Sequence, residues 1–174
     1  NLRLGVNAGN SIASGGNFNV VVGDEAGTAI TTGDNNVGVG YAALAKVTTG
    51  QYNVGAGTEC LTDLTTGSFN TALGDGAGGN TTTASNNTSI GAGSLFQNTT
   101  GASNTVVGKD AGRANTSGSE NVAVGMNALD ANTTGASNVA VGQGAMDTNT
   151  TGVSNTAVGH DSLKLNTTGA DNTA

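Results

Sequence analysis

A strict seventeen-residue repeat constrains the fold of this chain more than any other feature. From Val20 to Asn172 the sequence divides without remainder into units of seventeen residues, preceded by one unit of eighteen. Numbered from its first residue, every unit has an aliphatic residue at position 3, glycine at 4 and a small residue at 7, and every unit ends in asparagine, which is position 17 of the seventeen-residue units. A fixed period of this length is typical of solenoids, in which each repeat forms one coil of a stack.

The repeat therefore predicts an all-β, parallel β-solenoid with one coil per seventeen residues. We expect a single solenoid domain over residues 1–174. Because the chain opens on Asn-Leu-Arg-Leu rather than on methionine, we expect it to be a fragment of a longer fibrous protein. The coils, numbered 1 to 10 in chain order, are 2–19, 20–36, 37–53, 54–70, 71–87, 88–104, 105–121, 122–138, 139–155 and 156–172.

Each position that recurs from unit to unit has a structural interpretation. Positions 1 to 3 are rich in valine and threonine and predict a short strand, with positions 1 and 3 facing the interior. The glycine at position 4 predicts a corner, because glycine reaches positive φ without a steric penalty. These corner glycines are Gly5, Gly23, Gly40, Gly57, Gly74, Gly91, Gly108, Gly125, Gly142 and Gly159.

The asparagine at position 17 predicts a ladder of side-chain amides, stacked in register from coil to coil. Its members are Asn19, Asn36, Asn53, Asn70, Asn87, Asn104, Asn121, Asn138, Asn155 and Asn172. Positions 7 and 8 predict a second inward-facing segment, in which glycine replaces leucine where a neighbouring coil fills the space. Thr-Thr-Gly at positions 12 to 14 predicts a third extended piece closed by a turn.

No single coil can bury its few apolar residues alone, so the coils must stack, with an expected spacing of ~4.8 Å and a rod roughly 50 Å long. Helices are disfavoured because glycine recurs every few residues. Disorder is disfavoured because disordered tracts have no reason to keep a register.

Position 11 changes along the chain. Coils 2 to 4 carry Ile30, Val47 and Leu64, coil 5 carries Thr81, and coils 6 to 10 carry asparagine. One interpretation is that the early coils contact another chain or a preceding domain there, whereas the later coils present an asparagine ladder to solvent or to themselves.

Composition excludes several classes of function. The formal net charge is −7, and the five lysine and arginine residues are scattered, which argues against nucleic acid or an anionic membrane as partner. Apolar runs are far shorter than the ~20 residues of a membrane span. The single cysteine, Cys60, has no partner for an internal disulfide.

The segments Val122-Ala123-Val124-Gly125 and Thr156-Ala157-Val158-Gly159, each preceded by asparagine, resemble the YadA-like head repeats of trimeric autotransporter adhesins and related bacteriophage tail-fibre repeats. The resemblance extends along the whole chain, although the Asn-Thr-Thr-Gly segment makes each coil longer than in those heads. It implies a left-handed β-roll, a side-by-side homotrimer and a role in surface attachment.

Candidate chemistry is sparse. His160 is the only histidine and falls at position 5, where residues vary freely, so we expect a solvated loop residue. Cys60 replaces alanine at the small inward position, which suits a packed core. The acidic residues share no single column, which disfavours the regular sites of calcium-binding rolls, and the Thr-Thr pairs predict one outward threonine column rather than a flat ice-binding array.

The sequence thus predicts no catalytic residue, no cofactor and no metal site, and the protein is not expected to be an enzyme. We expect a structural and adhesive fibre module, the shaft or head of a phage tail fibre or of a bacterial surface adhesin. The expected location is extracellular, on a virion fibre or a cell surface, and the expected partners are further copies of the chain and a surface carbohydrate or protein receptor. The alternative is a ligand-specific repeat module, such as an ice-binding or calcium-dependent adhesin.

Overall fold

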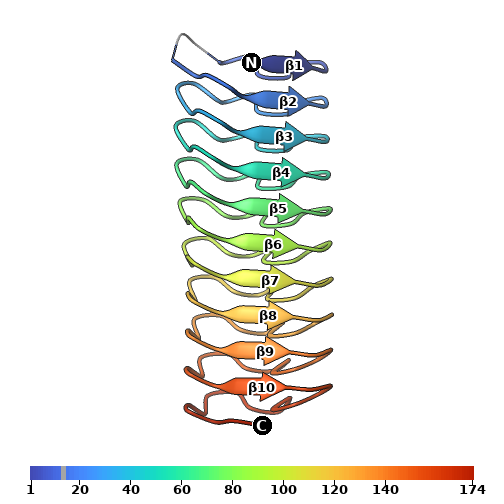
Figure 1. The fold of residues 1–174 in the computed structure, drawn as a ribbon, viewed down its shortest axis with the longest axis vertical. Coiled ribbons are helices and arrows are strands. Elements are labelled where there is room, and N and C mark those ends of the chain that lie inside the picture. Colours follow the sequence, from blue (N-terminus) through green and yellow to red (C-terminus); the bar gives the residue numbers. More distant parts are fainter. Residues whose placement is uncertain (13–14) are drawn as a thin grey trace.

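The computed structural model describes residues 1–12 and 15–174; residues 13 and 14, which belong to the predicted coil 2–19, lie outside it. Within the described residues, ten three-residue strands form one parallel sheet in the order β1 to β10 (Figure 1). The strands are β1 (Leu2–Leu4), β2 (Val20–Val22), β3 (Val37–Val39), β4 (Val54–Ala56), β5 (Thr71–Leu73), β6 (Thr88–Ile90), β7 (Thr105–Val107), β8 (Val122–Val124), β9 (Val139–Val141) and β10 (Thr156–Val158).

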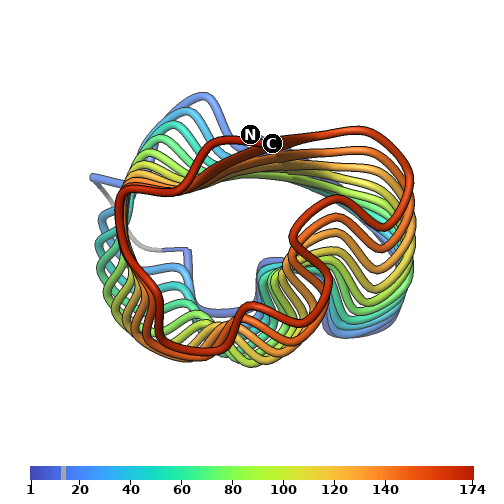
Figure 2. The same cartoon turned by 90° about the horizontal axis from the view of Figure 1, so that it is seen from below.

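The strand register follows the sequence repeat. Val20 pairs with Val37, and Val37 pairs with Val54, so equivalent residues of successive coils lie next to each other. Seen along the long axis, successive coils overlie one another with a small progressive rotation (Figure 2). The predicted all-β parallel solenoid with seventeen residues per turn is confirmed.

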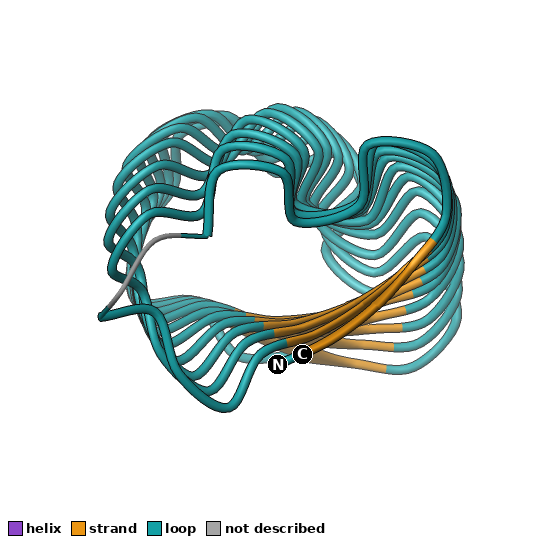
Figure 3. Cartoon of the chain, turned by 90° about the horizontal axis from the view of Figure 1, so that it is seen from above, coloured by secondary structure: helices purple, strands orange, loops and turns teal. Residues whose placement is uncertain are grey.

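The strands occupy one side of each coil, and turns and bends form the remainder (Figure 3). These irregular segments are also hydrogen-bonded from coil to coil: the Gly27 amide donates to the Ala43 carbonyl at 2.9 Å, and the Thr31 amide to the Thr48 carbonyl at 3.0 Å. The Thr-Thr-Gly segment is therefore a ladder of bends rather than a third strand. The described residues contain no helix that is long and apolar enough to cross a membrane.

The structure corrects the predicted direction of the strand side chains. The middle residue of the strand, at position 2, faces the interior: Val21, Ala72 and Ala123 are completely buried. Positions 1 and 3, which the alternating pattern assigned to the interior, are exposed or half-buried. The pattern misled because the interior behind the strand is also filled from position 8, as by Leu44 opposite Gly38, so it accommodates one strand side chain per coil rather than two.

Positions 2 and 8 share the same interior space within one coil. Coil 2 combines Val21 with Gly27, where an added Cβ on the glycine would lie 2.5 Å from Val21 Cγ1. Coil 3 combines the opposite sizes, Gly38 with Leu44, and Leu44 is fully buried. The prediction that a neighbouring coil fills the space beside glycine holds at Gly78, where an added Cβ would lie 2.8 Å from Leu61 Cδ2.

Three further positions in every coil adopt left-handed backbone conformations that the sequence interpretation missed. Residues at positions 6, 8 and 16 have φ near +60°, and many are not glycine; Leu44 has φ +56° and Tyr52 has φ +57°. Left-handed conformations of such residues are unfavourable by roughly 1–2 kcal/mol each. The signal was present in the frequent Gly, Asn and Asp at position 6 and in the Gly at position 8, whereas position 16, which carries mainly Ser, Phe, Tyr and Glu, gave little indication.

Candidate functional site

The position-17 asparagines stabilise the interior. Asn53 is representative: its backbone amide and its side-chain Nδ2 each donate to Asn36 Oδ1 at 3.0 Å, and Nδ2 also donates to the Gly67 carbonyl at 3.0 Å. The same contacts recur along the stack, and the members from Asn19 to Asn155 are buried. Because the amides are satisfied internally, this ladder offers no surface to a ligand.

The corner glycines lie at the end of each strand with φ between +126° at Gly91 and +142° at Gly108. A side chain at this corner would also collide with the next coil, since an added Cβ on Gly40 would lie 2.4 Å from the Gly57 carbonyl oxygen. Both the dihedral angle and the close stacking of coils therefore require glycine here.

Position 11 forms a second internal column. Ile30, Val47 and Leu64 are completely buried, so the interpretation that they contact another chain is wrong. In the later coils the asparagines bond to one another: Asn132 Nδ2 donates to Asn115 Oδ1 at 2.8 Å and to the Gly135 carbonyl at 3.0 Å. The alternative in which that ladder is presented to itself is confirmed.

The two residues singled out for possible reactivity lie in different environments. His160 is exposed, and its Nδ1 lies 3.5 Å from Asp161 Oδ2. Cys60 is buried, and its Sγ donates to the Gly74 carbonyl at 2.7 Å. Burial raises the pKa of the Cys60 thiol, which favours the unreactive protonated form.

The acidic side chains are distributed over the surface rather than gathered into a binding cage. Among the described residues no group of three or more His, Cys, Asp or Glu side chains is placed to hold a metal ion. Asp130 lies in the same column as Asp147, one coil away. Burial and, secondarily, the negative charge of Asp147 raise the pKa of Asp130.

The threonine pairs form two columns with different roles. At position 12 the hydroxyl is used internally, as where Thr48 Oγ1 donates to the Thr65 carbonyl at 3.2 Å. At position 13 the side chains are exposed, including Thr49, Thr66 and Thr134. The outward column is thus a single line of hydroxyl groups.

The outer face of the sheet is a further candidate interaction surface. It comprises positions 1 and 3 of every strand, and we name it the outer stripe. These positions carry Val, Thr, Leu, Ile and one Ala, and no charged residue. Within the stack the position-3 side chains remain open to solvent, with Val124 36% and Val39 41% exposed. Contiguous exposed apolar surface is a common place of contact with another molecule, so the outer stripe is a candidate interface.

Comparison of the chain with protein-family models, with curated proteins and with solved structures found no match. The resemblance to adhesin-head and tail-fibre repeats therefore stays a prediction, and the geometry carries the functional argument.

Proposed function

We propose that this chain is a non-enzymatic structural and adhesive fibre module that attaches its carrier to a host or another surface. The supporting observation is the continuous coil-to-coil hydrogen bonding, which includes the strands, the turns and both asparagine columns. Adjacent coils are joined by many bonds that must break together, so the stack suits a load-bearing shaft or head. The location that fits this role is extracellular, on a phage tail fibre or on a bacterial surface adhesin.

In this proposal the outer stripe joins three copies of the chain side by side. A stripe without charges meets an identical stripe without repulsion, although the chain as a whole carries a net charge of −7. Burial of the exposed valines and leucines would drive the association. The number of chains and a left-handed winding are implied by the resemblance to the adhesin repeats.

The mass of the particle in solution tests this assembly. Sedimentation equilibrium should give three times the mass of one chain. The double variant Val124→Asp/Val141→Asp places carboxylates on the outer stripe and should shift the protein to single chains. Its matched control, Thr134→Asp/Thr151→Asp, adds the same charges to the exposed threonine column of the same coils and should leave the mass unchanged. A wild-type protein that stays a single chain at its highest soluble concentration would overturn the trimer.

The alternative functions have separate signatures. An ice-binding module would produce thermal hysteresis, and a calcium-dependent adhesin would melt at a higher temperature when calcium is added. The fibre proposal expects neither effect in the purified protein.

A further inference from the structure

A hollow of about 350 Å³ lies on the side of the solenoid formed by positions 5, 6 and 9 of coils 4 to 7. Its floor arises from the sequence of the position-6 column, which runs Glu59, Gly76, Gly93, Asp110 along these coils. Nowhere else does the column have two glycines in succession. Two neighbouring coils therefore lack a side chain at this place, and a cavity opens between two carboxylates.

An aromatic ring forms the wall of the hollow. Phe96 lies against the glycines of the preceding coil: an added Cβ on Gly76 would lie 3.3 Å from Phe96 Cδ2, and one on Gly79 would lie 3.1 Å from Phe96 Cε2. The ring therefore lies directly on the glycine backbone, in space that the side chain of any larger residue would occupy. Contact with two glycines holds the ring in place before a ligand arrives, which lowers the entropic cost of binding.

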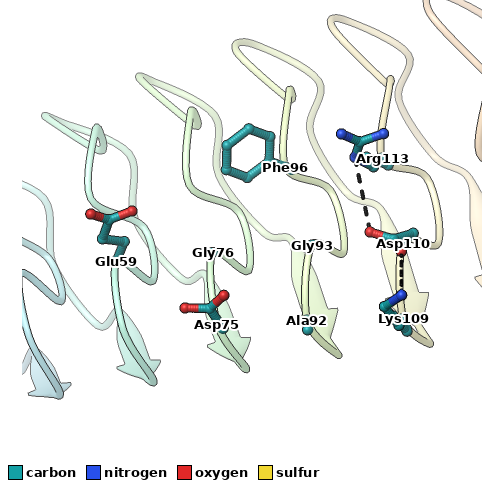
Figure 4. A pocket seen from close by; sticks show the side chains of 9 residues that line it. All are labelled: Glu59, Asp75, Gly76, Ala92, Gly93, Phe96, Lys109, Asp110 and Arg113. Carbon is teal, nitrogen blue, oxygen red and sulfur yellow. Dashed lines mark ion pairs between the residues drawn. The ribbon is translucent and has the colours of Figure 1, made fainter.

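Charged groups of both signs line the two ends of the hollow. At one end Glu59 and Asp75 form no ion pair among the described residues. At the other end Asp110 lies between two cations, with its Oδ2 3.2 Å from Lys109 Nζ and its Oδ1 3.9 Å from Arg113 Nε. Figure 4 shows the Phe96 ring between these two groups.

We propose that this hollow binds a short oligosaccharide. The face of an aromatic ring stacks against the C–H face of a pyranose, carboxylates accept hydrogen bonds from sugar hydroxyls, and lysine and arginine donate to ring and hydroxyl oxygens. The volume lies at the small end of the ~300–1,000 Å³ range of ligand pockets and suits one or two sugar units. Nucleic acid is disfavoured, because the two cations are already paired with Asp110 and three carboxylates line the same hollow.

This inference rests on the attachment function proposed above, since it supplies the ligand class that such a fibre would recognise. A trimer would present three such hollows, and simultaneous weak binding at several of them would raise the overall affinity for a surface. Its test is independent of assembly, because binding to the hollow is measured whatever the number of chains.

The experiment screens the purified protein against a panel of neutral, amino-sugar and uronic-acid oligosaccharides by saturation-transfer NMR and quantifies the hits by calorimetry. Gly93→Asn should fill the hollow and displace the Asp110 carboxylate, because an added Cβ on Gly93 would lie 2.5 Å from Asp110 Oδ1. The backbone tolerates asparagine, which occupies the same column at Asn7 and Asn127 with φ +60° and +56°. The matched control is Gly144→Asn, in the same column with φ +65° but outside the hollow. Phe96→Ala removes the aromatic wall.

We expect at least one oligosaccharide to bind, with affinity reduced about tenfold or more by Gly93→Asn and by Phe96→Ala and unchanged by Gly144→Asn. The proposal is overturned if no member of the panel binds, or if binding is indifferent to Gly93→Asn. A trimer that binds no sugar would refute the hollow as a site and leave the trimeric fibre standing; a single chain that binds sugar would keep the hollow as a site and overturn the trimer.

Discussion

The two ends of the solenoid fill the same interior column with opposite chemistry. In coils 2 to 4 position 11 is apolar, and Ile30, Val47 and Leu64 pack in one buried cluster with the leucines of position 8. In coils 6 to 10 the same position is asparagine, and from Asn115 onward each amide donates to the asparagine of the coil before it. Backbone pairing is the same in both regions.

This contrast indicates that an interior position of this solenoid can be apolar or polar, provided that neighbouring coils carry the same type of residue there. A buried amide is costly when it lacks partners and nearly neutral when its donors and acceptors are satisfied. Stacking at a constant spacing supplies the partner automatically, provided that the next coil carries the same residue. Thr81, small and partly polar, lies at the junction between the two regimes.

The strongest test of this rule places the wrong chemistry in the apolar region. Val47→Asn should lower the free energy of unfolding by about 3–5 kcal/mol, because it removes buried methyl groups and leaves an amide oxygen between Ile30 and Leu64 without a donor. Urea denaturation measures the loss. Thr49→Asn, at the exposed threonine column of the same coil, is the control and should change stability by less than ~0.5 kcal/mol. Equal losses in both variants would refute the rule.

The reverse substitution in the asparagine region should cost less. Asn132→Val removes the bond to Asn115 Oδ1 and the acceptor used by Asn149 Nδ2, but it gains apolar burial, so we expect a loss of about 2–3 kcal/mol. Replacing all five asparagines of the column, from Asn98 to Asn166, by valine should lower the free energy of unfolding by clearly less than five times the single change. In that variant no asparagine is left beside a valine with an unsatisfied amide group. Strict additivity in the denaturation data would argue against the uniform-column rule.

Packing within a coil provides a test that involves no hydrogen-bond ladder. Gly38→Val should cost about 2 kcal/mol by overpacking, because an added Cβ at Gly38 already lies 3.4 Å from Leu44 Cδ1. The double variant Gly38→Val/Leu44→Gly recreates the Val21–Gly27 combination of coil 2. It should be more stable than the sum of the two single changes predicts. A double-mutant cycle measures this coupling, and a coupling energy near zero would contradict the shared-space interpretation.

The smallest expected effect concerns the surface of the asparagine-rich region. The pKa of Asp130 is raised in the folded protein, so the folded state holds a proton there more tightly than the unfolded chain does. The ionised carboxylate is therefore unfavourable at neutral pH, and the penalty disappears as the pH falls through the raised pKa. Asp130→Asn should raise the free energy of unfolding at about pH 7 by well under ~1 kcal/mol, seen as a small rise in Tm. At about pH 3 the substitution should leave Tm unchanged. A lower Tm at neutral pH would contradict this sign.

Much of the architecture was predictable because the repeat leaves few choices. The glycine, the small residue and the asparagine are separated by the same distances in every unit, as in-register stacking requires. The coil length, the parallel register and the corner at Gly40 are therefore predictable from the sequence. The hollow at Gly76 and Gly93 was not predictable in the same way. Its glycines are visible in the sequence, but nothing in one coil indicates that Phe96 of the next coil lies against Gly76, or that Asp110 of the coil after that lies beside Gly93.

The direction of the strand side chains separates the two sources of information most clearly. The period, the register and the residues that form continuous columns could all be read from the repeat, because they depend only on repetition. That position 2 faces inward and the valines of positions 1 and 3 face outward becomes evident only in the folded coil. The space behind each strand is shared between positions 2 and 8 and holds no more than one large side chain per coil, so only position 2 of the strand points inward and its two neighbours point outward.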